Sequence, residues 1–247
     1  MTTHLKTSVP EYTYEEPVAV IGDIHGCANL LEQLLVLIGD RPILTTGDVG
    51  DRGPDTRKVL DILIARQAKG VMGNHDQWLR QLVMEGKLDR LALSAAVKGI
   101  PTLVSYGFQH PTVPAEIEAQ VKRIPKAHVG WLKALPLIAG LTVMGQRFWL
   151  SHVGVPRFPH LVNLPLDQVI PTLALVDEDN LLWAFEDPRM SLQTDRTVIM
   201  GHVALSQPLM LPHIINVDTG AGKGGGLTAL LIPEMSFVTV GLDEVSG

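Results

Sequence analysis

Three short polar motifs follow one another in the first third of the chain, and each comes directly after an apolar stretch. They are Gly22-Asp23-Ile24-His25-Gly26, Gly47-Asp48-Val49-Gly50-Asp51-Arg52-Gly53 and Gly73-Asn74-His75-Asp76. Their carboxylate, amide and imidazole groups are ligands for divalent metal ions. The first aspartates of the first two motifs are 25 residues apart, and the asparagine of the third follows 26 residues later. That interval fits one strand, loop, helix and return, so we expect the motifs to meet at the carboxyl ends of parallel strands.

The candidate ligands are too many for one ion. Two later loops, Ser151–Gly154 and Gly201–His202, each add a histidine after a predicted strand. A tetrahedral site needs four ligands, whereas two ions that share a carboxylate would use the whole set. Two ions about 3.5–4 Å apart can clamp the attacking and leaving oxygens of a phosphoryl displacement. The six predicted metal ligands are therefore Asp23, His25, Asp48, Asn74, His152 and His202.

Apolar patterns predict the elements that carry these loops. Short β-branched runs predict strands at 18–21, 42–46 and 71–72, and the spacing of apolar residues predicts helices at 28–38, 55–67 and 76–84. Strand patterns return at 137–144, 147–151, 197–200, 214–217, 227–232 and 236–240, the last two as a hairpin. Early βα units followed by clustered strands predict an α/β fold. We expect an α/β/β/α sandwich of two stacked mixed sheets flanked by helices.

The chain is predicted to hold one main domain. Residues 1–17 form a polar, acidic N-terminal extension, and residues 18–247 form a single domain without a linker-like interruption. Within the domain, the proline-containing segment at roughly 87–135 predicts a small helical insertion or cap.

Composition narrows the class of protein. The chain has 247 residues, a net charge of −6 and one cysteine, Cys27. The negative charge is unlike the basic footprint of a nucleic-acid-binding protein. No apolar run of about 18 residues predicts a membrane span. A single cysteine allows no internal disulfide and fits a reducing compartment. We therefore expect a cytoplasmic enzyme that binds neither nucleic acid nor membranes.

The motifs, in this order and at this spacing, resemble the PPP family of metallophosphoesterases, the phosphoprotein phosphatases. The family pattern reads GDxHG, GDxxDRG and GNH[ED], followed by two further histidines. Trp131–Leu137 also resembles the family's segment ahead of the first of these histidines. The resemblance covers roughly residues 18–240 and is strongest with bacterial and phage members. These include lambda-type protein phosphatases and PrpE-type diadenosine tetraphosphatases.

The resemblance implies two divalent metal ions, with manganese preferred and iron or zinc as alternatives. It implies that Asp23 and His25 bind the first ion, that Asp48 bridges the two ions, and that Asn74, His152 and His202 complete the second.

The resemblance also implies catalytic roles. His75 becomes the general acid that protonates the leaving oxygen, Asp51 orients it, and Arg52 holds the phosphate oxygens. An imidazole can deliver a proton near neutral pH, and a guanidinium fork matches a phosphoryl group.

The resemblance further implies a second phosphate-binding arginine, two residues after a Leu-Trp pair. That position is Phe185 in this chain, so Arg189 is the nearest substitute, with Arg157 and Arg196 as further candidates.

Three other features have ordinary interpretations. The segment Gly220–Gly225 matches the letters of a dinucleotide-binding fingerprint, but a strand is predicted after it, so we interpret it as a flexible loop near the rim of the site. Asp218 is interpreted as a turn residue. Cys27, beside the first motif, is predicted to pack as a small buried side chain.

The predicted function is hydrolysis of phosphomonoesters by direct attack of a metal-bridging hydroxide, with phosphoserine or phosphothreonine in proteins as the preferred substrate. The alternative is a bis(5'-nucleosyl)-tetraphosphatase that acts on diadenosine tetraphosphate. A third hypothesis is a non-catalytic interaction scaffold, which typically loses a ligand or the acid. The expected partners are therefore a phosphorylated protein or a small phosphoester or nucleotide.

Overall fold

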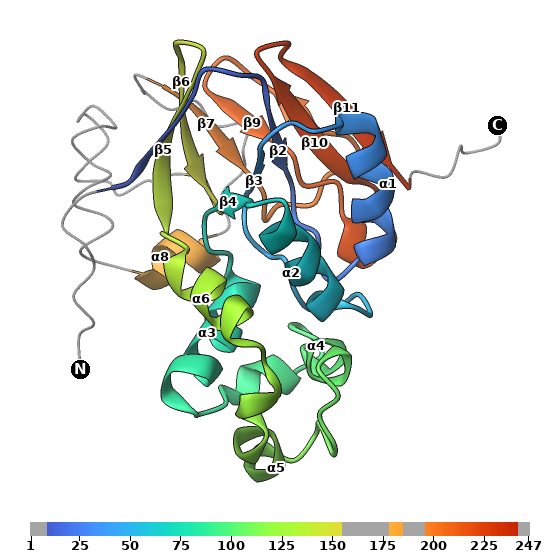
Figure 1. Cartoon of the computed structure of the whole chain (residues 1–247). Coiled ribbons are helices and arrows are strands. Elements are labelled where there is room, and N and C mark those ends of the chain that lie inside the picture. Colours follow the sequence, from blue (N-terminus) through green and yellow to red (C-terminus); the bar gives the residue numbers. More distant parts are fainter. Residues whose placement is uncertain (1–8, 155–177, 185–195, 242–247) are drawn as a thin grey trace.

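Two β-sheets lie face to face, and helices cover one outer face and one end of this pair (Figure 1). This computed structural model describes residues 9–154, 178–184 and 196–241. The arrangement confirms the predicted sandwich of two mixed sheets flanked by helices. Within these ranges, no helix combines the length and apolar character needed to cross a bilayer.

The first sheet carries the three early motifs. Its five strands lie in the order β11-β10-β2-β3-β4. Strands β2 (Val18–Ile21), β3 (Ile43–Thr45) and β4 (Lys69–Gly70) are parallel, as the motif spacing predicts. The hairpin of β10 (Leu227–Ile232) and β11 (Ser236–Val240) extends the sheet antiparallel to β2. The carboxyl ends of β2 and β3 therefore lie side by side.

The second sheet supplies the two late histidine loops. Its strand order is β1 (Glu11–Tyr14), β5 (Ile138–Val143), β6 (Gln146–Ser151), β7 (Thr197–Met200), β9 (Ile214–Asn216) and β8 (Leu209–Met210). Strands β5 and β6 pair antiparallel, and β7 runs parallel to β6, so the carboxyl ends of β6 and β7 are adjacent.

Strand β2 lies between the second sheet on one face and the helices on the other. Its four residues are fully buried, and alternate side chains point to opposite faces of the sheet. Val18 and Val20 pack with Leu141 and Leu150 of the second sheet, whereas Ala19 and Ile21 pack on the helix side. A strand buried on both faces needs a continuous apolar sequence, which is what this segment has.

Helices connect the strands of the first sheet. Helix α1 (Ala28–Ile38) lies against β10 and β11, and α2 (Thr56–Ala65) packs beside it. The Asp55 side chain caps α2 by accepting a hydrogen bond from the Lys58 backbone N–H. Helix α3 (Asn74–Glu85) follows β4 and begins at the third motif.

The segment at 87–135 is helical throughout its regular elements and lies at one end of the sandwich (Figure 1). Its elements are η1 (Arg90–Leu93), α4 (Ile100–Ser105), α5 (Pro114–Ala119), η2 (Val121–Arg123) and α6 (Lys126–Ala134), and α8 (Glu178–Trp183) lies near this end. Helix α6 packs against α2 and α3, and α4 packs against α2. The boundaries predicted for the domain and its N-terminal extension stay predictions.

The main differences from the predictions concern four elements. The strand expected at 71–72 lies two residues earlier, at β4, although the Val71 N–H still bonds to the Thr45 carbonyl. Helix α3 begins at Asn74 and not at Asp76, because the Asp76 carboxylate folds back onto the Gly73 N–H at the helix start. Strands β1 and β8 were not predicted, and β1 lies within the proposed N-terminal extension.

Candidate metal and catalytic site

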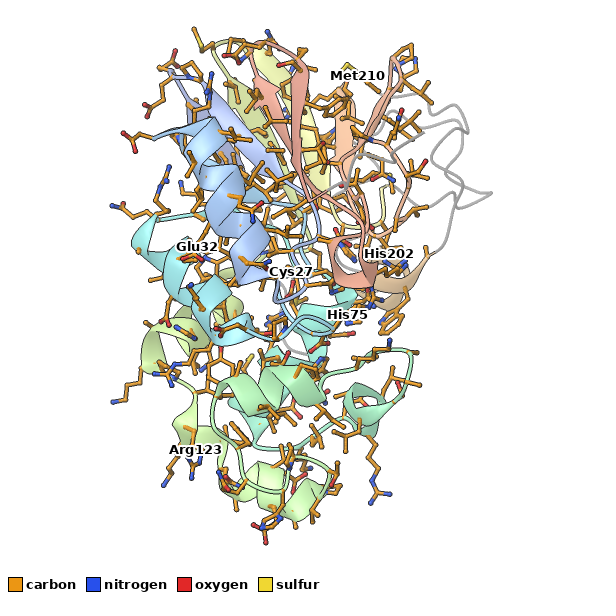
Figure 2. The ribbon with its side chains drawn as sticks, turned by 90° about the vertical axis from the view of Figure 1, so that its right-hand side faces the viewer. Cys27, Glu32, His75, Arg123, His202 and Met210 are labelled. Atoms are coloured by element: carbon orange, nitrogen blue, oxygen red, sulfur yellow. The ribbon has the colours of Figure 1, made fainter. Side chains whose placement is uncertain are left out.

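The six predicted ligands converge at strand ends of both sheets. They come from five loops: Asp23 and His25 after β2, Asp48 after β3, Asn74 at the start of α3, His152 after β6 and His202 after β7. His202 is half-buried, and the other five are buried. Figure 2 shows His202 near His75, between the sheets and the helical segment.

Asp48 stands between two groups of ligating atoms. Its Oδ2 lies 3.6 Å from His25 Nε2, and its Oδ1 lies 3.5 Å from His152 Nε2. Among the described residues, two sets of side chains each bring their ligand atoms within 4.8 Å of one another: His25, Asp48 and His75, and Asp48, His152 and His202. A carboxylate shared by two groups is the arrangement that two neighbouring ions require.

The hydrogen bonds of His152 leave an electron pair directed into the site. Its Nδ1 lies 2.9 Å from the Thr46 carbonyl, which can only accept, so Nδ1 carries the hydrogen and Nε2 in the neutral ring does not. Nε2 lies 3.0 Å from Asn74 Oδ1 and 3.2 Å from His202 Nδ1. With the hydrogen on Nδ1 alone, Nε2 and Asn74 Oδ1 both offer electron pairs, and a cation bound to both atoms would satisfy them. The donor set therefore fits a metal ion.

Asp23 lies beside these groups without belonging to either. Its carboxylate accepts the His202 backbone N–H at 3.1 Å and the Thr46 hydroxyl at 3.3 Å. Burial, together with the charges of Asp218 and Asp48, raises the pKa of Asp23 well above its usual value. Close carboxylates with little access to water need positive charge nearby, and divalent ions would supply it.

His25 and Arg52 define the other side of the site. The Nδ1 of His25 bonds to the Gly50 carbonyl at 2.9 Å, so its Nε2 also presents an electron pair. The Arg52 guanidinium, which has only donors, reaches His25 Nε2 at 2.8 Å and His75 Nε2 at 3.0 Å. Burial lowers the pKa of His25 to about 3 and keeps the ring neutral. A neutral imidazole with a fixed tautomer suits a ligand role.

His75 is oriented by a buried hydrogen-bond network. Its Nδ1 lies 2.8 Å from Asp51 Oδ2, and Asp51 also accepts from Trp78 Nε1 at 2.8 Å and from the Thr102 hydroxyl at 2.7 Å. Burial alone would lower the pKa of His75, but the charge of Asp48 and the hydrogen bond with Asp51 outweigh it and raise the pKa. The bond to Asp51 fixes which nitrogen faces that carboxylate, so Nε2 faces the site.

Asp76 supports the loops and was not predicted to have a role. Its buried carboxylate accepts the backbone N–H groups of Asp48 at 2.8 Å, Val49 at 3.0 Å and Gly73 at 2.9 Å. Burial and the charge of Asp48 raise the pKa of Asp76 to about 7. The available signal was an acidic residue three positions after Gly73, the spacing of a capping box at a helix start.

Two glycines let the ligand loops approach closely. A Cβ on Gly201 would lie 2.0 Å from Asp23 Oδ1, and a Cβ on Gly73 would lie 2.1 Å from Asp48 Oδ1. Both distances are far below contact, so any side chain at these positions would displace a predicted ligand.

The second phosphate-binding arginine is not assigned by the structure. Arg189 and Arg157 lie outside the described residues. Arg196 forms an ion pair with Glu11 of β1 at 2.9 Å and stacks on Trp149, 4.3 Å from the ring centroid. These contacts tie Arg196 to the second sheet, so it is not a candidate for the phosphate site.

The glycine-rich loop lies against the ligands. It contains the short turn η3 (Ala221–Lys223) and leads into β10, so it offers no helix N-terminus, as expected. A Cβ on Gly222 would lie 2.6 Å from that of His25. Asp218 Oδ1 accepts the Gly220 N–H at 2.9 Å, which is the predicted turn role. Cys27 is buried, as predicted, with Sγ 3.5 Å from the Ala221 carbonyl.

Known proteins match most of the length of this chain. Residues 16–229 match the calcineurin-like phosphoesterase family. The asymmetrical bis(5'-nucleosyl)-tetraphosphatase PrpE of Oceanobacillus iheyensis is 26% identical over 247 aligned residues, which cover 90% of this chain and 91% of that protein. The protein of the same name from Anoxybacillus flavithermus is 28% identical over 250 residues, covering 90% and 92%.

Solved structures share the fold. A crystal structure provisionally named a diadenosine tetraphosphatase gives a TM-score of 0.61 at 23% identity and covers 96% of this chain and 100% of that chain. A protein serine/threonine phosphatase from Saccharomyces cerevisiae gives a TM-score of 0.56 at 14% identity, covering 97% and 84%. The family match spans most of the chain, and the donor groups that such enzymes need meet at the strand ends. The chain therefore belongs to the calcineurin-like phosphoesterase family and is a metallophosphoesterase.

Proposed function

We propose that the chain hydrolyses dinucleoside tetraphosphates at a phosphoanhydride bond with the help of two divalent metal ions. The observation that carries the proposal is the pair of ligand groups that share Asp48, because this arrangement suits phosphoryl transfer. The choice of substrate is supported by the relatives from Oceanobacillus iheyensis and Anoxybacillus flavithermus, whose names describe them as bis(5'-nucleosyl)-tetraphosphatases.

The six converging side chains are the proposed metal ligands. Manganese is the proposed ion, with iron or zinc as alternatives. Bound ions would polarise the phosphoryl oxygens and provide a nucleophile from water near neutral pH. As the family resemblance implies, Asp23 and His25 would hold the first ion, Asp48 would bridge, and Asn74, His152 and His202 would hold the second.

Three side chains of the second and third motifs would act on the substrate. His75 would donate a proton from Nε2 to the leaving oxygen, because its Nδ1 is bonded to Asp51 and its raised pKa favours the charged ring. Asp51 is a positioning residue that sets the tautomer and direction of this ring. Arg52, whose guanidinium reaches both His25 and His75, would hold the phosphoryl oxygens as a fork.

Lys223 supports a substrate with several phosphates. It is exposed on η3, beside the ligand loops, and its charge acts on both His202 and Asp218. A phosphomonoester brings one phosphate to the metals, whereas a tetraphosphate brings a chain of anionic groups beyond it. Lys223 would bind that chain as a point charge.

Hydrolysis of phosphoserine or phosphothreonine in proteins is the second candidate, supported by the motif resemblance and the intact Asp51-Arg52 pair. The full set of ligands and the acid support an active enzyme over a non-catalytic scaffold.

One comparison tests the proposal. We expect kcat/KM for diadenosine tetraphosphate to exceed that for every member of a phosphopeptide panel on the same manganese-loaded sample. Chromatography should detect AMP and ATP as products, since the relatives are named asymmetrical. Higher kcat/KM values for the phosphopeptides would favour the second candidate, and hydrolysis of neither substrate would reject both.

A further inference from the structure

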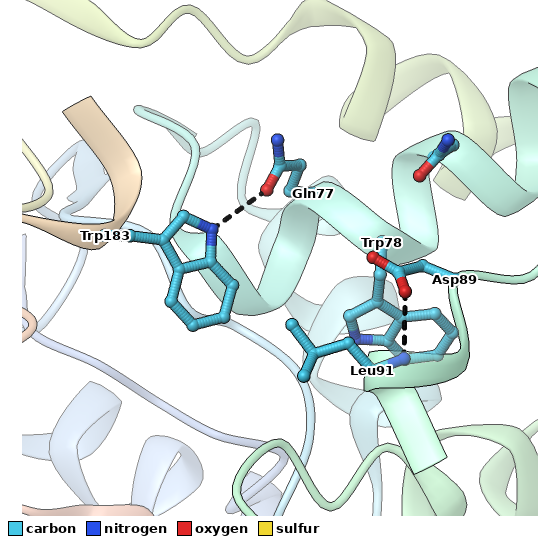
Figure 3. Close-up of a pocket in the computed structure, with 6 residues that line it drawn as sticks. Gln77, Trp78, Asp89, Leu91 and Trp183 are labelled. Atoms are coloured by element: carbon cyan, nitrogen blue, oxygen red, sulfur yellow. Dashed lines mark hydrogen bonds between the residues drawn. The ribbon is translucent and has the colours of Figure 1, made fainter. Parts of the chain in front are cut away.

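A pocket of about 480 Å³ opens beside the catalytic residues, between α3, η1 and α8. Its volume lies within the range of small-molecule sites, about 300–1,000 Å³. Two indoles, one aliphatic side chain and three polar side chains line it, and nothing in the proposed hydrolysis uses most of them (Figure 3). The lining residues are Gln77, Trp78, Gln81, Asp89, Leu91 and Trp183.

The pocket shares a wall with the catalytic site. Trp78, one of its lining residues, donates from Nε1 to Asp51 Oδ2, the same oxygen that bonds to His75. Helix α3 carries His75 and, further along, Gln77 and Gln81. Gln77 and Gln81 lie about 200° and 240° around the helix axis from His75, whereas Trp78 is about one turn from His75 on the same side. Through Trp78 and Asp51 the pocket therefore adjoins the network that orients the proposed proton donor to the leaving group.

The lining suits a flat aromatic ring. Trp183 is 40% exposed, and its indole N–H donates to Gln77 Oε1 at 3.2 Å, which fixes the ring edge. Leu91, 45% exposed, points toward this indole across the pocket in Figure 3. An exposed indole and an aliphatic side chain in one pocket offer apolar surface on which a flat ring can stack.

Polar groups border this apolar surface. Asp89 is exposed and holds its carboxylate in place by accepting the Leu91 N–H at 2.8 Å through Oδ1, which leaves Oδ2 to accept another hydrogen bond. The exposed Gln81 amide offers both a donor and an acceptor. Ring N–H groups and ring nitrogens of a heterocycle are the partners that such groups recognise.

We propose that this pocket binds the nucleobase on the leaving-group side of a nucleotide substrate, with the base stacked on Trp183. The inference rests on the proposed function, since it names how that site would recognise a nucleotide. It also explains how an enzyme whose motifs handle only phosphorus would prefer a nucleoside polyphosphate over a plain phosphoester.

Binding of two product-like ligands tests the pocket without requiring turnover. AMP and ribose 5-phosphate carry the same phosphate and sugar and differ by the base. We expect calorimetry on manganese-loaded protein to give a Kd for AMP about tenfold or more below that for ribose 5-phosphate, the effect of one stacked base. Trp183→Ala should abolish this difference, and Trp183→Phe should retain most of it.

Met210→Ala is the matched control, because Met210 is a similarly exposed apolar side chain, 39%, on β8 far from His75 (Figure 2). It should leave the preference for AMP unchanged. Circular dichroism checks that each variant is folded. Equal Kd values for the two ligands, absence of AMP binding, or a preference that survives Trp183→Ala in folded protein would overturn the proposal.

Kinetics separates this inference from the proposed function. In Trp183→Ala, the ratio of kcat/KM for diadenosine tetraphosphate to that for glycerol phosphate should fall about tenfold or more, mainly through KM. If the unaltered enzyme does not hydrolyse diadenosine tetraphosphate but still prefers AMP over ribose 5-phosphate, the proposed function fails and the pocket stands. If the unaltered enzyme hydrolyses the dinucleotide but Trp183→Ala changes neither the ratio of the two Kd values nor the ratio of the two kcat/KM values, the proposed base pocket is wrong and the proposed function stands.

Discussion

Replacing His75 with Asn should distinguish substrates by the quality of their leaving groups. The backbone N–H of His75 donates to Asp48 Oδ1 at 2.9 Å, and any residue at this position keeps that bond. Asp51 would lose one partner but retain Trp78 and Thr102. The change therefore removes the proton donor while the ligand loops stay in place.

The magnitudes follow from these contacts. Loss of one hydrogen bond to a buried carboxylate that remains otherwise paired costs about 1–3 kcal/mol, below the 5–15 kcal/mol that typically separates folded from unfolded protein. A general acid contributes about 10²–10⁴-fold to the rate when the leaving group needs a proton. An alkoxide needs that proton, whereas the phosphate of a departing nucleotide can leave as an anion. We expect kcat for glycerol phosphate to fall by about 10²–10⁴-fold and kcat for diadenosine tetraphosphate by less than tenfold.

Steady-state kinetics of both substrates, with metal content measured by mass spectrometry, checks this prediction. The matched control is His110→Asn, because His110 is exposed and adopts φ 52°, a backbone conformation that Asn tolerates. It should change neither rate. An equal loss for both substrates at full metal content would refute the role of His75 as a proton donor, because a positional or metal defect affects all leaving groups alike.

Three further substitutions test the site. Gly201→Ala should lower metal content measured by mass spectrometry, because its Cβ would lie 2.0 Å from Asp23 Oδ1; Gly130→Ala, which meets nothing within 4 Å, should leave it unchanged. Asp76→Ala should lower the free energy of unfolding in urea by about 3 kcal/mol or more, because it leaves three buried N–H donors without an acceptor. A loss below about 1 kcal/mol would contradict the role of Asp76 in holding these three loops. Arg52→Ala should weaken inhibition by inorganic phosphate about tenfold or more in a competition assay, and an unchanged inhibition constant would remove Arg52 from the phosphate site.

Local patterns were sufficient for the motif loops and for the elements next to them. Strand β2 and helix α1 lie at the residues predicted for them, 18–21 and 28–38, because an apolar run marks the strand, helical spacing of apolar residues marks the helix, and a glycine follows each. Strands β6 and β7 lie close to their predicted positions because each contains a short apolar run. The convergence of the ligands followed from a general rule of parallel sheets.

Features that depend on distant partners were not predictable from one sequence. Strand β1 is short and half-exposed, and it becomes a strand only by pairing with β5, which lies far along the chain. The pocket joins Trp183 of α8 to α3 and η1, and no periodicity connects these segments. The role of Asp76 depends on three backbone groups brought together by the finished fold.

The two-metal site is the central claim, and its stoichiometry is the measurement that tests it most directly. Protein stripped of metal should be titrated with manganese while bound metal and hydrolysis of diadenosine tetraphosphate are followed together. Because two ligand groups share Asp48, we expect activity to rise until two ions are bound per chain and then to level off. Full activity with one ion bound, or activity in the stripped protein, would contradict this account.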